Sequence, residues 1–529
     1  MSRRTRWILI VLAGSEAVIV LDLAFGSIVI DDVMAEFGAS LAQLQAVLVA
    51  YALIVAALTL VGGWFGSRFG SRRALGIGLA IRAAGAAVTA CAFDIWSYAL
   101  GEAVLAGIGM ALVAPAASSL TGSLFEGRER SRAFATVGMS IAVAAGIGPV
   151  VGGWLTTELS WRWCDWFECA ICLALFAGHV VIPVITRTTT RAGFDWTGVV
   201  LSGMSFVLIV FGLNQATSWG LWADLQSPLA PFGLSLTPFV VAAGIVMGAL
   251  FLLVERRRSA LGLPVIVSTD MLRNRALRAS LLTTVASQGA LAGLLFAIPV
   301  YLQVIEGRSA VVSGLYLVPM SITAFLASSL WPRLAARVTV NVLGVVAGGF
   351  MLLCAVLVYW DMSPALWGST LLAGVGVFGL GIGIMDSQLD AVTLSTVPTE
   401  RSEEAAGLQC TSDNFGSALG IALAGTVMIL TLTAGMSSYL RAEPELDPAV
   451  RSAVLLRVEN GVPVVNVAGA KAFVESTGAT PDEVERITTA YRLHQHVALE
   501  RSLAACGLMA LLTIALSTKL PRRRFVDAT

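Results

Sequence analysis

The feature that most constrains this chain is an apolar run of about 20 residues that recurs along its length, because a helix of that length crosses a hydrocarbon layer of roughly 30 Å. Only helices and closed barrels satisfy every backbone polar group inside a bilayer. Composition agrees: of 529 residues, 57% are hydrophobic and 13% are charged, whereas a soluble domain carries about 25% charged residues. The sequence therefore predicts an all-α polytopic membrane protein.

We predict about fourteen membrane spans, with both termini in the cytoplasm. With the N-terminus inside, lysines and arginines concentrate in the segments on that side, and the short loops opposite hold only Arg162 and Arg308. Because basic loops stay in the cytoplasm, we expect a multi-pass protein of the inner (plasma) membrane. The predicted spans are 7–30, 43–65, 74–93, 96–118, 133–156, 162–184, 196–214, 236–254, 279–304, 312–331, 341–360, 366–391, 408–434 and 497–518.

Two longer polar segments interrupt the regular succession of apolar spans. Residues 255–278 form a basic cytoplasmic loop, and residues 435–496 form a long polar loop on the outer face. In the second, Thr480-Pro-Asp-Glu483 has the pattern of a capping box, so we expect a helix that begins there and continues into the last span. Asp447-Pro448 predicts another helix start, and Asn460-Gly461 suggests a hairpin. The sequence leaves open whether this loop is a small folded cap or a flexible segment.

Two glycine-rich segments resemble motifs of the major facilitator superfamily. The loop after the second span resembles motif A, in which glycines permit a tight turn and arginines bind acidic groups and helix C-termini. The fifth span resembles motif C, which is associated with the antiporter branches and whose glycines permit close helix contact. The residues that carry motif A are Gly63, Arg68, Gly70 and Arg72. Those that carry motif C are Gly148, Pro149, Gly152 and Gly153.

Further short segments are similar to the fourteen-helix drug:proton antiporter branch of that family. They are Leu21-Asp22, Trp161-Arg-Trp163, Phe194-Asp-Trp-Thr-Gly198 and Tyr301-Leu-Gln303. The resemblance implies a major facilitator fold of two six-helix bundles with two inserted helices, working as a monomer. It places the bundles in residues 1–186 and 279–529, and the inserted helices with their basic loop in residues 187–278.

The chain also departs from the family pattern. Ser67 and Ser71 stand where motif A usually has Asp and Arg. In the fourth span, Ala103 stands where motif B would place an arginine, with Glu102 beside it. In the family, that arginine is thought to take part in proton coupling, so its absence puts standard coupling in question.

Acidic residues inside the predicted spans are the candidate site. Each ionisable group there costs roughly 2.5 kcal/mol or more, so each needs a reason. Asp22 occupies the family's acidic position in the first span, with helix–helix hydrogen bonding as the alternative. Glu102 lies in a span that is cavity-lining by resemblance, although it could simply pair with Arg82. We expect both carboxylates to take part in proton or substrate coupling.

Asp386 and Asp390 lie four residues apart, on one face of the twelfth span. Asp413 enters the next span from the same side, so the three carboxylates are predicted to share a site that binds and releases protons. Interfacial exposure, or pairing with cytoplasmic arginines, is the alternative. Glu16 in the first span is a further buried acid.

The sixth span poses a separate question. Asp165, Cys169, Cys172 and His179 fall near one helical stripe, with Glu168 beside them. Such ligands suit a soft divalent metal, but one helix rarely supplies a complete site. We expect instead that Asp165 and Glu168 pair with Arg82 or Arg162, and we predict no metal and no cofactor.

These observations predict a transporter and not an enzyme. The sequence has no phosphate-cradling Gly-Lys-Ser/Thr loop and no nucleophile elbow, so nucleotide use is not expected, and its net charge of +0 favours no nucleic-acid partner. The resemblance implies a multidrug-type exporter that exchanges protons for amphipathic molecules. The excess of buried acids over bases favours cationic or neutral substrates. Two alternatives stay open: a dedicated exporter of an endogenous lipid or secondary metabolite, and a non-transporting receptor or assembly factor that acts through residues 435–496.

Overall fold

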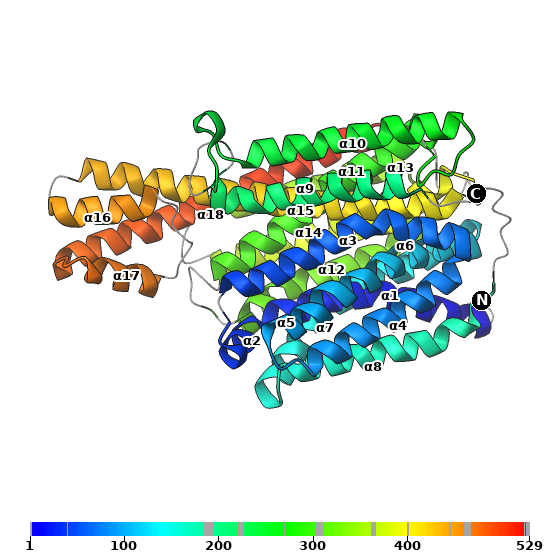
Figure 1. The fold of residues 1–529 in the computed structure, drawn as a ribbon, viewed down its shortest axis with the longest axis horizontal. Coiled ribbons are helices and arrows are strands. Elements are labelled where there is room, and N and C mark those ends of the chain that lie inside the picture. The colour runs from blue at the N-terminus through cyan, green and yellow to red at the C-terminus, as the bar shows by residue number, and fades with distance from the viewer. Residues whose placement is uncertain are drawn as a thin grey trace.

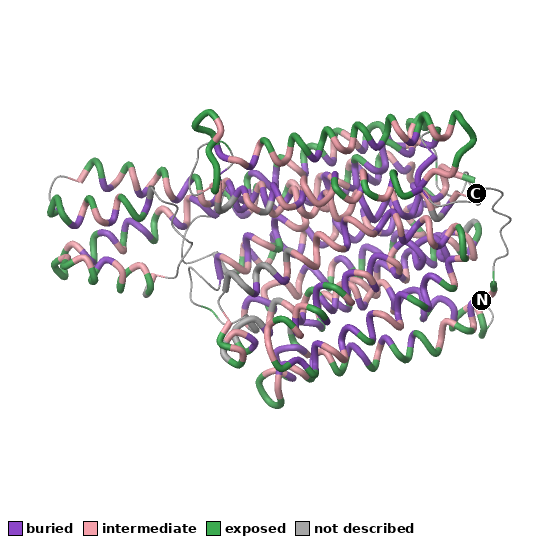
Figure 2. Tube along the Cα trace, viewed as in Figure 1, coloured by how far each residue is buried: buried purple, intermediate pink, exposed green. Residues whose placement is uncertain are grey.

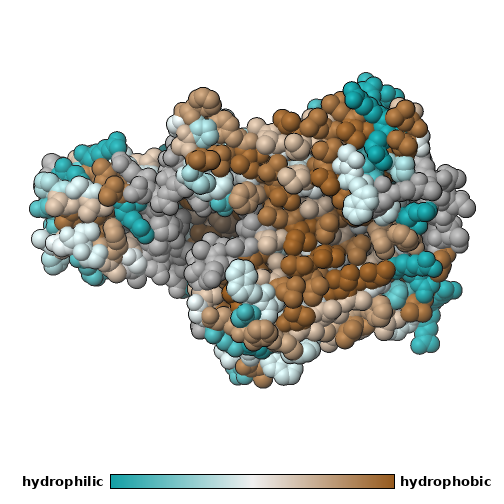
Figure 3. All heavy atoms as spheres, in the orientation of Figure 1, coloured by the Kyte–Doolittle hydropathy of each residue, from teal (hydrophilic) through white to brown (hydrophobic). Residues whose placement is uncertain are grey.

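The computed structural model is helical throughout the residues that it describes. Within this described part, fourteen helices are long and apolar enough to cross a membrane, which confirms the predicted all-α fold with its fourteen spans. On the face drawn in Figure 3, apolar side chains cover the middle of the molecule and hydrophilic ones gather towards its two ends. The described residues are 3–39, 41–184, 195–220, 222, 227–268, 270–302, 308, 310–360, 367–398, 401–443, 446–459, 467–522 and 524.

The first bundle packs α1, α7 and α8 around α4 and α6, with α3 against α6 (Figure 1). Its fourth span is not a uniform helix, because a π-helical turn, η1, separates α5 from α6. The sequence did not predict this turn or the short helix α2. The bounds are α1 Arg3–Ile28, α2 Ile30–Phe37, α3 Leu41–Phe69, α4 Ser71–Ala90, α5 Ile95–Ala99, η1 Leu100–Leu105, α6 Ala106–Leu124, α7 Gly127–Glu158, α8 Arg162–Gly178 and η2 His179–Val181.

The second bundle repeats this plan. In it α11 packs on α15 and α18, α12 on α14, and α13 on α14 and α18. The two bundles meet where α7 contacts α12 and α14, and where α15 contacts α3 and α6. The bounds are α11 Arg275–Val300, α12 Ala310–Ala335, α13 Val340–Trp360, α14 Trp367–Ser395, α15 Ser402–Ala442 and α18 Pro481–Ser517.

Two further long helices, α9 (Trp196–Trp219) and α10 (Thr237–Ala260), lie outside this pair of bundles. Helix α9 packs on both α3 and α15, and α10 packs on α9. Half of the residues of α10 are exposed (Figure 2), including the apolar side chains of Ile245 and Leu253. Such a face suits contact with lipid chains. The remaining short helices are η3 Pro231–Gly233 and η4 Met271–Arg273.

Helix α1 begins and α18 ends at one end of the molecule, which we call the terminal face (Figure 1). The opposite end carries the cap, formed by α16 (Pro448–Glu459), α17 (Val467–Ser476) and the adjoining ends of α15 and α18. The cap has its own apolar core, which joins residues such as Leu440, Val454 and Ile487. The long polar loop is thus a folded cap in its described part.

Both helix starts predicted in this region are confirmed. Asp447 Oδ1 accepts a hydrogen bond of 2.7 Å from the Ala449 amide at the start of α16. Thr480 and Glu483 form the expected capping box, and α18 continues without a break into the last span. The expected hairpin at Asn460-Gly461 lies outside the described residues.

Candidate functional site

Four carboxylates gather between the two bundles, and we call them the interface acids. They come from α1 (Glu16), α14 (Asp386 and Asp390) and α15 (Asp413). Asp390 acts electrostatically on Glu16, and Asp386, Asp390 and Glu16 all act on Asp413. All four side chains are partly accessible and not sealed in the core. The predicted grouping of Asp386, Asp390 and Asp413 is therefore present, with Glu16 added from the other bundle.

The interface acids have neutral partners in place of basic ones. The Ser118 hydroxyl donates to Glu16 at 3.0 Å, and Gln288 Nε2 donates to Asp386 at 3.0 Å. No Arg, Lys or His of the described chain acts on any of the four. Close carboxylates without a cation cannot all stay ionised at low dielectric. The arrangement can therefore hold protons or a cation, and its members come from both bundles.

A second cluster lies inside the first bundle, around Arg82 of α4, whose side chain has 0% exposure. Its Nη2 atom pairs with both Asp22 of α1 and Glu168 of α8, and the Glu168 distance is 2.6 Å. Its Nη1 atom is 4.0 Å from Glu102, which lies in the π-helical turn η1. We call Arg82, Asp22, Glu102 and Glu168 the Arg82 cluster. The structure thus contains both predicted pairings, that of Glu102 with Arg82 and that of Glu168 with Arg82.

Several polar atoms of the Arg82 cluster have no hydrogen-bond partner within the described chain. They are Nε and Nη1 of Arg82, Oε2 of Glu102 and Oε1 of Glu168. Tyr51 of α3 lies within electrostatic reach of Asp22 and Arg82. A buried polar atom without a partner costs free energy. These atoms can therefore still bind a water molecule or a proton, or take part in a changed pairing.

Motif B would place an arginine at position 103, where this chain has Ala103. Ala103 is buried and supplies no charge. The guanidinium beside Asp22 comes instead from Arg82 on the neighbouring helix α4. The sequence located Arg82 and Asp22 inside spans, but it could not show that the two helices turn these side chains towards each other.

The motif A residues form a turn and a close contact at the terminal face. Gly70 joins α3 to α4 with φ 96°, a left-handed conformation that favours glycine. A Cβ added at Gly407 of α15 would lie 3.6 Å from Gly63 Cα, so motif A touches the second bundle. Nearby, the Ser119 and Ser402 hydroxyls of α6 and α15 lie 3.2 Å apart. Ser67, in the usual Asp position, donates to the Trp64 carbonyl at 2.7 Å.

The motif C glycines bring α7 close to α1, a partner helix that the sequence did not name. A Cβ at Gly148 would lie 2.6 Å from the Ala24 Cβ, and one at Gly152 would lie 2.8 Å from Phe25 Cδ1. Gly153 is buried beside them. Helix α7 therefore braces the helix that carries both Glu16 and Asp22.

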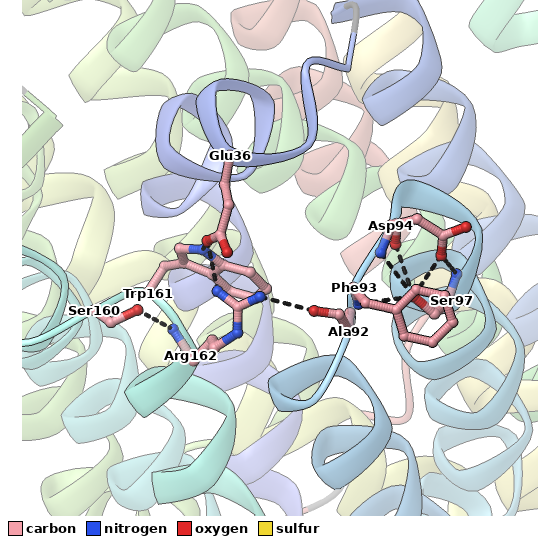
Figure 4. Close-up of polar contacts among 8 residues, drawn as sticks. All are labelled: Glu36, Ala92, Phe93, Asp94, Ser97, Ser160, Trp161 and Arg162. Carbon is pink, nitrogen blue, oxygen red and sulfur yellow. Dashed lines mark hydrogen bonds and ion pairs between the residues drawn. The ribbon is translucent and has the colours of Figure 1, made fainter.

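A polar cluster on the cap side of the first bundle ties α2 to α8 (Figure 4). Glu36 accepts hydrogen bonds from Trp161 Nε1 at 2.7 Å and from Arg162 Nη1 at 2.5 Å. Arg162 Nη2 also donates to the Ala92 carbonyl at 2.7 Å. The hydrogen bond from Arg162 holds the pKa of Glu36 below its ordinary value. Among the described residues, the ion pair of Arg162 is thus with Glu36, and Arg162 acts on Asp165 of α8 only electrostatically.

The acidic and cysteine stripe of α8 does not assemble into a metal site, since no suitable group of three His, Cys, Asp or Glu side chains occurs among the described residues. Cys164 lies near the Thr156 hydroxyl, and Glu168 binds Arg82. His179 lies in η2, where its ring contacts the Phe176 carbonyl. The side chains of this stripe therefore make separate contacts instead of forming one site.

Comparisons with known proteins agree with this architecture. Residues 12–421 match the model of the Major Facilitator Superfamily. A puromycin resistance protein of Streptomyces alboniger is 31% identical over 458 residues, covering 84% of this chain and 85% of that protein. A tetracenomycin C resistance and export protein of Streptomyces glaucescens is 27% identical over 434 residues, covering 79% and 75%. A solved human organic anion transporter has a TM-score of 0.55 and 14% identity, covering 81% of this chain and 94% of that one, and it supports the fold alone.

Proposed function

Since the chain belongs to the major facilitator superfamily, whose members are membrane transporters and not enzymes, we propose that it exports amphipathic small molecules in exchange for protons. The interface acids are the observation that carries this proposal. They lie between the bundles, they are partly accessible, and no described basic side chain offsets them. A cationic or neutral amphipathic molecule fits such a site better than an anion.

The exchange follows from competition for the same carboxylates. A bound cation offsets their mutual repulsion, and so do protons, so each displaces the other. If the two bundles rock about this site, the two ligands need only differ in affinity between the two conformations. We place the terminal face in the cytoplasm of a plasma-membrane protein and the cap outside. In that orientation the close approach of Gly63 to Gly407 and the contact of Ser119 with Ser402 join the two bundles at the cytoplasmic end.

A cellular efflux assay tests the proposal. An efflux-deficient host that expresses the wild type should expel ethidium in a gradient-dependent manner, and Asp390→Asn should lose most of this efflux. The matched control is Asp482→Asn, which removes an exposed carboxylate of the cap, 72% accessible, and should behave as wild type. Wild-type efflux that only anionic compounds inhibit would overturn the substrate class. Efflux by Asp390→Asn at the wild-type rate would overturn the assignment of the interface acids as the exchange site.

A second function is favoured by the names of relatives, since one is a tetracenomycin C resistance and export protein. A dedicated exporter of one endogenous metabolite would use the same two bundles and the same acids. A resistance screen separates the two functions. Protection against several unrelated cations supports the multidrug exporter, and protection against a single compound class supports the dedicated exporter.

A further inference from the structure

The exposed side of α10 changes from apolar to basic at one end. Along the second half of this helix the exposed residues recur in adjacent pairs, every third or fourth residue, so they form one stripe on one face. The pairs are Ile245 and Val246, Ala249 and Leu250, Leu252 and Leu253, and last Arg256 and Arg257. Hydrophilic side chains meet apolar ones at this end of α10, towards the terminal face (Figure 3). The apolar stripe therefore ends in two guanidinium groups.

The side chains of Arg256 and Arg257 have no ion pair and no hydrogen bond among the residues that the structure describes. Their neighbours in the sequence are turned inwards. Glu255 is 0% exposed and accepts a backbone hydrogen bond of 3.1 Å from the loop that follows α10. Arg258 pairs with Asp195 at the start of α9, with 3.2 Å between Nε and Oδ2. Two of the four charged residues are thus used inside the protein, and the two outward arginines are left for an external partner.

The residues directly after α10 suit the boundary of a bilayer. Gly262 has φ 71°, a left-handed conformation that glycine adopts readily. On either side of it, Leu261 is 74% exposed and Leu263 is 42% exposed. Exposed leucines beside arginines are typical of a segment that lies between lipid headgroups and acyl chains. The arginines therefore lie at the level of the headgroups.

We propose that Arg256 and Arg257 bind the headgroup of an anionic phospholipid, whose acyl chains lie along the apolar part of the stripe. A guanidinium group can donate two parallel hydrogen bonds to a phosphate. The headgroup also supplies the negative charge that these two side chains do not find within the described protein. A lipid fits better than a free phosphate ion, because only a lipid also covers the exposed side chains of Leu252 and Leu253. This inference goes beyond the proposed exchange of protons and does not depend on it.

The proposed lipid site lies beside the contacts that join the inserted helices to both bundles. Helix α9, on which α10 packs, contacts α3 of the first bundle and α15 of the second. The loop after α10 contacts α15 as well, since the Ser268 amide donates to Glu404 Oε2 at 3.1 Å. A bound lipid therefore adds contacts at the end of α10 from which this loop starts. We expect it to stabilise the inserted pair against the bundles.

Native mass spectrometry of the purified full-length protein in detergent measures the binding, with phosphatidylglycerol and phosphatidylcholine titrated separately. The wild type should bind phosphatidylglycerol more tightly than phosphatidylcholine. Arg256→Gln/Arg257→Gln should bind phosphatidylglycerol about 30-fold more weakly, which corresponds to about 2 kcal/mol for two basic side chains. The matched control is Arg457→Gln/Arg492→Gln, which removes the same charge from exposed positions of the cap and should behave as the wild type.

A second variant, Arg256→Lys/Arg257→Lys, keeps both charges and should retain most of the affinity for phosphatidylglycerol. Equal affinity of the wild type for the two lipids would overturn the inference, and so would wild-type affinity for phosphatidylglycerol in the glutamine variant. A loss in the lysine variant as large as that in the glutamine variant would refute the role of charge. Displacement of phosphatidylglycerol by inorganic phosphate would show a site for free phosphate and would overturn the assignment to a lipid.

Discussion

Replacing Arg82 with glutamine should be among the most damaging single changes in the first bundle. The variant removes the cation with which Asp22, Glu102 and Glu168 pair. The Arg82–Glu168 separation of 2.6 Å corresponds to about 6 kcal/mol of Coulomb energy at an effective dielectric constant of about 20. Desolvation of the ions offsets most of this energy in the intact protein. Breaking such a buried pair from one side nevertheless costs about 3–5 kcal/mol.

Thermal unfolding in detergent, followed by tryptophan fluorescence at one fixed heating rate, measures this loss. Arg82→Gln should unfold at a clearly lower temperature than the wild type. The double variant Arg82→Gln/Glu168→Gln should recover part of the loss, because one orphaned carboxylate is gone. The control is Arg273→Gln, since the Arg273 side chain is 76% exposed and pairs only with exposed Asp270 among the described residues, a kind of pair that contributes little. The reasoning is refuted if Arg82→Gln unfolds with the wild type, or if adding Glu168→Gln lowers stability further.

Two more predictions concern contacts away from the interface acids. Glu36→Gln should weaken the contact between α2 and α8 by up to about 1 kcal/mol. The pKa of Glu36 is lowered from 4.5, so the difference in melting temperature from the wild type should be full above pH 4.5 and shrink as the pH falls further. A difference that grows in acid would contradict this. Gly420→Ala would bring a Cβ to 2.6 Å from the Gly289 carbonyl carbon, so overpacking by about 1–3 kcal/mol should lower the yield of monodisperse protein. Gly349→Ala, where a Cβ meets nothing within 4 Å, is the control, and equal yields would refute the packing argument.

The sequence predicted the membrane spans well because each span is a long apolar run, and a bilayer leaves a helix little alternative. The helix starts at Pro448 and Pro481 were equally readable, since capping residues act locally. The helix α2 and the π-helical turn η1 were not predicted. Helix α2 is a single short amphipathic stretch, and the π-turn of η1 leaves no recognisable pattern in its residues.

The candidate site was predictable in part. The spacing of Asp386 and Asp390 places them on one face, and the direction in which Asp413 enters its span places it near them. Glu16 was recognised as a buried acid but not as a member of this group, because its neighbour Asp390 lies in the other bundle. The joining of Arg82 to Asp22 and Glu168 likewise depends on how three helices are rotated about their axes. Rotation of that kind is set by tertiary packing.

The central claim is that the interface acids exchange protons for a cation. Isothermal titration of tetraphenylphosphonium into the purified protein, repeated in two buffers of different ionisation enthalpy, counts the protons released on binding. We expect the wild type to release protons as it binds, and we expect the variant with Glu16→Gln, Asp386→Asn, Asp390→Asn and Asp413→Asn to lose both the binding and the release. Binding by that variant with the wild-type affinity and the same proton release would contradict the account.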